Sequence, residues 1–380
     1  MLDKIKKINI IKRIRKTIWY SRTRQYFPKS KPKYMDDRDQ LIDAEIVRIE
    51  WPASVKKPVF GIVQDYDVYP KWTKYRRFLE NNSFDYGIYH IHRHDWIDLS
   101  NQFDIIIGIP SNTLYDLQEI RSKYEILETF REKICYPSSV HARLFEDKCL
   151  EAYIAKVANI PFAKTYVLTD KDDALQLIAQ LKYPFVSKIV PSSASIGVEL
   201  VLNFTQARQI VNEVFSQHGK KTHMIYHQQK NLVYFQEFIP NDGYDIRIIV
   251  VGNKVFGYYR NVLEGDFRAS GMRKWEKREL PVEAMKIALK VNSVIESPVL
   301  AVDFLHDHEG KYTIIEYSPF YQMDSPEELH VNGIPGVYIF NQDGSYHFEI
   351  GKYWVAELAL RELLQNNYLP KLYNKGNNIL

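Results

Sequence analysis

The 380-residue sequence has no long uninterrupted apolar run and few cysteines. A membrane-spanning helix needs about 20 consecutive apolar residues, and no such run is present. The two cysteines, Cys135 and Cys149, form neither a disulfide framework nor a zinc-site spacing. The start of the chain does not read as a signal peptide, because lysines interrupt its apolar residues. These absences predict a protein of a reducing, cytoplasmic compartment.

The sequence also lacks the glycine-rich motifs of the commonest nucleotide sites. Neither G-x-x-x-x-G-K-[ST] nor G-x-G-x-x-G occurs, which argues against P-loop and Rossmann nucleotide binding. No internal repeat or low-complexity segment is present. At 380 residues the chain is long enough for two or three globular lobes with substantial cores.

Charge is distributed unevenly along the chain. Residues 1–33 carry twelve lysines or arginines and one acid, a net charge of +11, so the rest of the +4 chain carries −7. Apolar residues recur at helical spacing within this segment, namely Leu2, Ile5, Ile8, Ile11, Ile14, Ile18 and Trp19. A cationic amphipathic helix of this kind indicates that the partner is an anionic membrane surface. The protein would then lie peripherally on the inner face of that membrane. Packing on the protein's own body or on an oligomer partner is the alternative, and nucleic acid is not expected because the apolar stripe has no use there.

A small parallel α/β sheet is predicted after a polar, proline-containing linker at about 28–57. Apolar runs at 58–64, 86–91 and 103–110 alternate with helical stretches around 70–82 and 116–133. Such sheets bind ligands beyond the carboxyl ends of their strands. The substrate candidates there are Asp65, Asp67, Trp72, His92 and His94, with Ser111 and Asn112 after the third strand. His90, His92 and His94 alternate and should share one strand face, as substrate contacts or exposed residues, since no acid or cysteine completes a metal site.

The strongest chemical signal is a pair of acids in apolar surroundings. Asp303 lies in an apolar run and Glu316 follows two isoleucines, and the two runs predict a hairpin with a tight turn at Glu309-Gly310. With a two-residue turn, opposed positions have numbers that sum to 619, which places Asp303 across from Glu316. Opposed Cβ atoms lie about 5 Å apart. Both carboxylates could therefore bind one or two Mg²⁺ ions, with nucleotide phosphates as further ligands.

Candidate phosphate-binding cations lie upstream of these acids. Lys188 ends a strand-like run and leads into a small-residue loop at 191–198 that contains Ser193 and Ser195. Loop N–H groups and a neighbouring ammonium suit a phosphate. Lys148 lies early on an amphipathic helix. The stretch Gln236, Glu237, Phe238 and Ile239 has the character of a hinge strand, whose backbone can bind an adenine edge while apolar side chains cover the ring.

A second hairpin is predicted across Gly252-Asn253. Position numbers that sum to 505 pair Asp245 with Arg260, which would hold the guanidinium in a planar fork suited to phosphate or carboxylate. A structural salt bridge is the alternative. Arg247 projects on the same strand face as Asp245. Arg268, Arg273 and Lys274 follow in a basic loop, which either binds an anionic group of the acceptor or is solvated.

The order of these features resembles the ATP-grasp ligases, most closely the RimK-type branch of carboxylate–amine ligases, over roughly residues 137–322. The residues that carry the resemblance are Lys148, Lys188 with its loop, Gln236–Ile239, Asp245, Arg247, Arg260, the F-R-A-S-G run at 267–271, Asp303, and E-x-S at 316–318. The resemblance implies ATP and one or two Mg²⁺ ions as cofactors. It implies Asp303, Glu316 and Ser318 as metal ligands, and Arg260, Arg268 and Ser270 as catalytic residues. Ser318 and Ser270 stand where relatives often have Asn, and the phosphate loop is rich in serine instead of glycine.

The resemblance implies an α/β (α+β) ATP-grasp fold behind a small pre-ATP-grasp domain. The expected organisation is a basic amphipathic segment (1–35), a linker (36–57), a pre-ATP-grasp α/β domain (58–136), an ATP-grasp core (137–350, lid about 160–235), and a C-terminal helix and tail (351–380). A hairpin at Asp343-Gly344 and a helix over about 351–366 are predicted near the end.

The activity that the resemblance implies is amide-bond formation through an acyl-phosphate. With the basic segment, it suggests a small-molecule or lipid-linked glycan substrate and an amine, joined in polysaccharide biosynthesis at the membrane. The alternatives are a soluble peptide or amino-acid ligase, and a degenerate nucleotide-binding protein or membrane adaptor without ligase activity. A homo-oligomer is left open.

Overall fold

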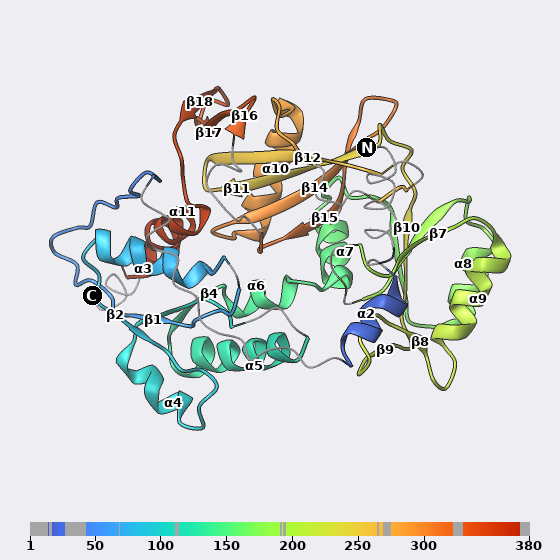
Figure 1. The fold of residues 1–380 in the computed structure, drawn as a ribbon, viewed down its shortest axis with the longest axis horizontal. Coiled ribbons are helices and arrows are strands. Elements are labelled where there is room, and N and C mark those ends of the chain that lie inside the picture. The colour runs from blue at the N-terminus through green and yellow to red at the C-terminus, as the bar shows by residue number, and fades with distance from the viewer. Residues whose placement is uncertain are drawn as a thin grey trace.

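The computed structural model describes residues 14, 17–26, 43–67, 69–110, 114–190, 192, 195–263, 266–268, 275–321 and 330–372. Three sheets of four or more strands organise this part of the chain, as Figure 1 shows. Their strand orders are β2-β1-β3-β4, β5-β10-β6-β7, and β15-β14-β11-β12-β17-β16 with β13 and β18 attached to β12 and β17. The predicted mixed α/β architecture is confirmed.

The first sheet is parallel, as predicted from its buried apolar runs. Its strands are β1 (Phe60–Ile62), β2 (Tyr86–Ile88), β3 (Ile105–Ile107) and β4 (Ile134–Tyr136), the last of which was not predicted. The helices are α3 (Lys71–Asn81), α4 (Trp96–Leu99), the 3-10 helix η2 (Ser100–Gln102) and α5 (Leu114–Phe130). Helices α6 (Ser139–Leu144) and α7 (Lys148–Val157) lead from this sheet to the rest of the chain.

The second sheet is small and antiparallel, and is called the lid here after the prediction for about 160–235. It contains β5 (Thr165–Leu168), β6 (Phe185–Lys188), β7 (Val198–Val201) and β10 (Val233–Glu237). Helices α8 (Lys171–Ile178) and α9 (Phe204–Val214) cover it, and a separate hairpin is formed by β8 (Lys220–Lys221) and β9 (Gln228–Gln229). Its core joins apolar side chains of both helices to Phe185, Val233 and Phe235.

The third sheet is antiparallel and buried on both faces. Its strands are β11 (Tyr244–Val251), β12 (Lys254–Asn261), β13 (Trp275–Glu276), β14 (Leu300–His306), β15 (Tyr312–Ser318), β16 (His330–Val331), β17 (Ile334–Phe340) and β18 (Tyr346–Ile350). Alternate β11 residues face opposite layers. Ile246 and Ile248 pack with α10 (Val282–Ile295), whereas Ile249 and Val251 pack with α11 (Val355–Glu362) and the parallel sheet.

The hairpin of β14 and β15 differs from the prediction at its turn. Residues 308–310 form a three-residue loop with Gly310 at φ +86°, a conformation that glycine adopts easily. The Asp307 carboxylate accepts hydrogen bonds from the N–H groups of Glu309 and Lys311 at 3.0 and 2.9 Å. The predicted two-residue turn at Glu309-Gly310 is therefore wrong, because this side chain stabilises the longer loop.

The other predicted hairpins are confirmed. Strands β11 and β12 pair from Val251–Lys254 to Asp245–Arg260 in the predicted register, across Gly252 with φ +58°. Strands β17 and β18 pair around the predicted Asp343-Gly344 turn. The C-terminal helix predicted over about 351–366 begins at Val355 and continues from Leu363 to Tyr368 as the π-helix η4. The predicted domain boundaries stay a prediction.

The basic N-terminal segment is described only in part. Helix α2 (Ile18–Arg24) is its described element, and residues 1–13, 15–16 and 27–42, which carry much of the predicted amphipathic pattern, lie outside the described residues. Of the predicted apolar stripe, Trp19 is 70% exposed. Among the described residues, no helix is long and apolar enough to cross a membrane.

Candidate active site

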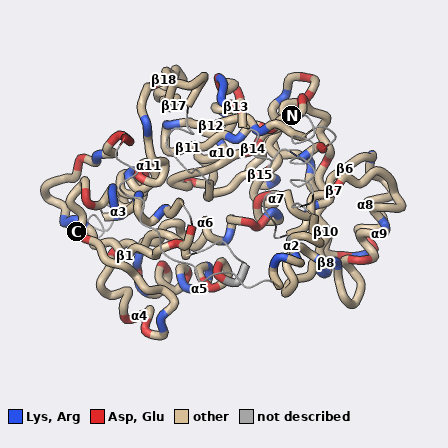
Figure 2. Tube along the Cα trace, in the orientation of Figure 1, with Lys and Arg blue, Asp and Glu red and all other residues tan. Residues whose placement is uncertain are grey.

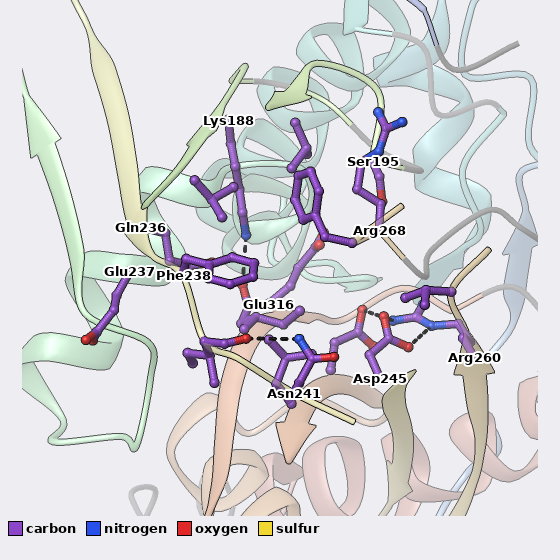
Figure 3. Close-up of a pocket in the computed structure, with 18 of the residues that line it drawn as sticks. Lys188, Ser195, Gln236, Glu237, Phe238, Asn241, Asp245, Arg260, Arg268 and Glu316 are labelled. Atoms are coloured by element: carbon purple, nitrogen blue, oxygen red, sulfur yellow. Dashed lines mark hydrogen bonds and ion pairs between the residues drawn. The ribbon is translucent and has the colours of Figure 1, made fainter. Parts of the chain in front are cut away.

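A cleft lies between the lid and the third sheet, and residues of both line it. Figure 3 shows Lys188 and Glu316 pointing toward each other across it. Of the predicted site residues, those that line the cleft are Lys148, Lys188, Ser195, Gln236, Glu237, Phe238, Ile239, Asp245, Arg260, Arg268, Asp303 and Glu316. Residues from the lid, α7 and the third sheet, about 170 positions apart at the extremes, thus come together.

Lys148 is fixed at the start of α7. Asp147 caps this helix by accepting the N–H of Leu150 at 3.0 Å. The Lys148 ammonium is buried and donates to the carbonyl of Ser192 at 2.5 Å and to Oε1 of Glu316 at 3.4 Å. Burial acts to lower the pKa of Lys148, but neighbouring carboxylates, Glu316 foremost, raise it above its usual value. The ammonium therefore stays charged.

Lys188, at the end of β6, reaches the same part of the cleft. Its ammonium donates to the carbonyl of Ile315 at 3.2 Å and lies 5.8 Å from the centre of the Tyr234 ring. Burial lowers the pKa of Lys188 to about 8, although the Glu316 carboxylate opposes this. A buried cation of this kind is poorly compensated until an anion arrives.

Two acids and two arginines form a buried network on the opposite wall. Arg260 donates to both oxygens of Asp245, at 2.5 and 2.9 Å, and Arg247 donates to both oxygens of Asp303, at 2.7 and 2.8 Å. Arg260 Nη2 also lies 2.7 Å from Asp303 Oδ2 and so joins the two pairs. Burial would raise the pKa of Asp303, but the two guanidinium groups hold it well below its usual range.

Asp303 and Glu316 are direct partners in the β14–β15 ladder, as predicted. A β-bulge between Asp303 and Phe304 restores this register, because the pairs nearer the loop, such as Phe304 with Ile314, are offset by one residue. The two carboxylates thus share one sheet face with Ser318, whose Oγ accepts the N–H of Phe320 at 3.1 Å.

This set of oxygen donors fits Mg²⁺. Protein sites for Mg²⁺ commonly supply one or two carboxylates and leave the other positions to phosphates and water. Within the described ranges, no group of three or more His, Cys, Asp and Glu residues could hold a metal ion by itself, so phosphate ligands would be needed. Both Asp303 oxygens already contact arginines, whereas the Glu316 side chain is 33% exposed and more open to a cation.

The other end of the cleft is apolar and suits a flat ring. Phe238 and Phe267 meet edge to face with centroids 6.2 Å apart. Gln236 anchors the hinge by donating to Thr165 Oγ1 at 3.0 Å. Several lining residues were not predicted, namely Val186, Asn241, Tyr244 and Leu305. Strand periodicity could have indicated Val186 and Leu305, which lie two residues from Lys188 and Asp303.

Not every predicted site residue is among the described residues that line the cleft. Ser193, Ser270 and Arg273, like Ser111 and Asn112, fall outside the described residues. Arg247 contacts Asp303 and is absent from the cleft lining, as is Ser318. Arg268 lines the cleft and pairs with Asp266. The roles assigned to all these residues stay predictions.

The substrate candidates of the parallel sheet do not line the cleft. Asp65 is buried, which raises its pKa to about 6, and it accepts the N–H groups of Lys71 and Trp72 at the start of α3. This places it as a helix cap. Trp72 is buried in the core and Asp67 is exposed.

The predicted alignment of three histidines on one strand face is wrong. Strand β2 ends at Ile88, and the chain turns where His92 and His94 lie, because the alternating polar residues have no further strand to pair with. His92 contacts Glu119 at 2.9 Å and His94 is exposed.

The cleft between a lid and an antiparallel sheet, with buried lysines facing an acid pair, defines an ATP-grasp enzyme. Residues 146–328 match the model of the RimK-like ATP-grasp domain, and this part of the chain contains the cleft described above. The chain is an ATP-grasp ligase, a class that uses ATP with Mg²⁺.

Two relatives illustrate the similarity. The α-aminoadipate–LysW ligase LysX of Saccharolobus solfataricus is 27% identical over 274 residues, covering 70% of this chain and 90% of that protein. The coenzyme γ-F420-2:α-L-glutamate ligase of Methanocaldococcus jannaschii is 28% identical over 172 residues, covering 44% of this chain and 55% of that protein. The structure of the ATP-grasp ligase PsnB complexed with minimal precursor has a TM-score of 0.52 at 12% identity, covering 82% of this chain and all of that one, and so shares the fold.

Proposed function

We propose that this chain joins a carboxylate to an amine at the expense of ATP, through an acyl-phosphate. The observation that carries the proposal is the charge arrangement of the cleft. Lys148 and Lys188 come from one side, and Glu316, Asp303 and Arg260 from the other. Such a site can neutralise phosphates and the charge that develops during phosphoryl transfer.

The residues that line the cleft fall into groups suited to the adenine ring, the phosphates and the metal ion. The hinge at 236–239, with Phe267 nearby, is suited to the adenine ring, and the two lysines lie where phosphates would follow. Glu316 and Asp303 would hold Mg²⁺, which when bound supplies positive charge beside the phosphates. Arg260, held by Asp245, keeps a fixed orientation toward the same region.

The proposed chemistry has two steps. A substrate carboxylate oxygen attacks the γ-phosphorus, the bond from phosphorus to the ADP oxygen breaks, and ADP leaves with that electron pair. The amine nitrogen then attacks the acyl carbon, the carbon–oxygen bond to phosphate breaks, and the nitrogen loses a proton to solvent. Arg260 offsets the charge on the transferred phosphoryl group.

The experiment is ATP-dependent phosphate release with paired substrates. Candidate carboxylates, including amino acids and uronic-acid sugars, are tested with and without an added amine. Phosphate release that requires both partners is expected. Release that ignores the amine with every pair, or no ATP binding, would instead support a kinase-like or degenerate protein.

The finer part of the proposal concerns the substrate. We infer a sugar carboxylate of a lipid-linked, cell-surface glycan precursor, joined to an amino acid or similar amine. Its support is the basic charge of residues 1–33, of which residues 1–16 alone carry seven lysines or arginines and one acid, since each basic residue near an anionic leaflet contributes about 1 kcal/mol. Because α2 lies on the lid, membrane contact is assigned to residues 1–16.

A peptide or carrier-protein acceptor is the second candidate, and the relative named as a LysW ligase favours it. Vesicle sedimentation separates the two candidates. Binding of the full-length protein to anionic vesicles at low salt, and its loss on removal of residues 1–16, supports the glycan proposal. A protein that ignores such vesicles and turns over peptides supports the other.

A further inference from the structure

Helix α2 is attached to the lid by side-chain contacts that span about 200 positions in the sequence. Arg22 Nη1 donates to the carbonyls of Thr222 and Met224, at 3.0 and 2.9 Å. Gln25, just after the helix, donates from Nε2 to the carbonyl of His223 at 2.7 Å and accepts the N–H of Ile225 at 3.1 Å. Figures 1 and 2 show α2 beside the β8–β9 hairpin that holds these residues.

These contacts add partners for the backbone of the loop between β8 and β9. Each of the four consecutive residues 222–225 has one backbone group hydrogen-bonded to Arg22 or Gln25. Unpaired backbone groups are costly when buried. His223 Nδ1 and His227 Nε2 are buried without a hydrogen-bond partner among the described residues. Within the loop, the Thr222 hydroxyl donates to the carbonyl of His227 at 2.6 Å and accepts the N–H of Met224 at 3.1 Å. Arg22 and Gln25 hold the loop from outside, and the two histidine rings contribute little.

The same loop continues into contacts with the phosphate end of the cleft. Gln229, at the end of β9, accepts the N–H of Val190 at 3.0 Å and donates to the carbonyl of Leu232 at 2.7 Å. Val190 begins the loop whose Ser192 carbonyl accepts from Lys148. Burial, together with the charges of His227 and Lys148, lowers the pKa of His223.

We propose that Arg22 and Gln25 are positioning residues for the phosphate-binding loop, and that α2 is a working part of the lid. They act through the 222–229 loop and Gln229, and do not touch the nucleotide. The inference rests on the proposed function in that it takes the loop after β6, here represented by its described residues Val190, Ser192 and Ser195, as the phosphate site. It predicts that the N-terminal segment has two separable halves.

Two truncations and one double substitution test this. Removing residues 1–16 should leave the Kd for ATP within about twofold, since the described contacts begin at residue 22. Removing residues 1–26 should raise it about tenfold, as expected for the loss of charge-assisted hydrogen bonds. Arg22→Ala combined with Gln25→Ala in the full-length chain should also raise the Kd for ATP about tenfold. This double variant tests the proposal even if the longer truncation does not fold.

The matched control is Arg24→Ala, which removes one exposed positive charge from the same helix. It should bind ATP as the full-length protein does. The double variant should raise KM for ATP with kcat at saturating ATP little changed, whereas a general loss of folding would lower kcat by reducing active protein. Arg22→Lys, which keeps the charge, should give an intermediate value.

Unchanged ATP affinity in the double variant would overturn the inference. This outcome is distinct from failure of the proposed function, in which ATP binds but amine-dependent phosphate release is absent. It is also distinct from failure of the membrane assignment, in which vesicle binding is absent but the difference between the two truncations persists.

Discussion

Tyr317 donates two hydrogen bonds to Glu151, one from its backbone and one from its side chain. The Tyr317 N–H donates to Oε2 of Glu151 at 3.3 Å, and the Tyr317 hydroxyl donates to the carbonyl of Glu151 at 2.6 Å. Both residues are almost fully buried. Glu151 lies one helical turn after Lys148, and Tyr317 follows Glu316. This pair therefore holds α7 against β15 where Lys148 meets Glu316.

Glu151→Ala should weaken ATP binding about tenfold, because it removes an acceptor of a buried hydrogen bond. Glu151→Gln should retain most of the affinity, since the amide oxygen can still accept the Tyr317 N–H. Titration calorimetry with a non-hydrolysable ATP analogue gives both values. In a Lys148→Met background the Ala effect should disappear if Glu151 acts through Lys148, and full additivity would contradict this role.

Asp303→Asn and Glu316→Gln should both abolish turnover, because each removes a charged metal ligand of the proposed site. They should differ in stability. Asp303→Asn leaves Arg247 and Arg260 without a shared counter-ion in a buried site, a change that costs about 3–5 kcal/mol. Glu316→Gln, at a partly exposed side chain, should melt near the original temperature. Normal turnover in either variant would contradict its role as a metal ligand.

ATP affinity should fall as the pH rises through about 8. The pKa of Lys188 is lowered to about 8 by burial, so its charge is present below this pH and lost above it. Lys188→Ala should weaken ATP binding strongly and remove this pH dependence. Lys182→Ala, at an exposed position on the approach to the same strand, should change neither. A flat affinity between pH 7 and 9 in the unmodified protein would contradict the assignment.

Glu357 predicts a pH dependence of stability far from the cleft. It is buried in α11 beside Arg77 of α3, with Nη1 to Oε1 at 2.6 Å, and burial raises its pKa to about 7. Because the folded pKa exceeds the unfolded value, the stabilising contribution is full below about pH 4.5 and is lost as the pH rises through 7. The melting temperature of the unmodified protein relative to Glu357→Gln should therefore decline between pH 5 and 8. A constant difference would contradict the raised pKa.

The pairing of Asp245 with Arg260 was predictable because it depends on local rules. A two-residue Gly-Asn turn sets the register, and strand periodicity sets the faces. The pairing of Asp303 with Glu316 was predicted from a wrong turn. The three-residue loop shifts the pairing register by one residue relative to the predicted two-residue turn, and the bulge in β15 shifts it back by one. The two differences from the prediction therefore cancel at Asp303 and Glu316. The Asp307 side chain that stabilises the loop was visible in the sequence, whereas nothing local indicated the bulge.

The sequence by itself determined the alternating strands, the charged segment at the start, and the ATP-grasp order of lysines and acids. These follow from periodicity, turn chemistry and composition, which act over a few residues. Only the tertiary structure decided that Arg247 neutralises Asp303, that Glu151 lies behind Lys148, and that Arg22 and Gln25 bind a loop about 200 positions away. Such contacts depend on how separate elements pack together, and no short-range pattern specifies which buried charge will meet which partner.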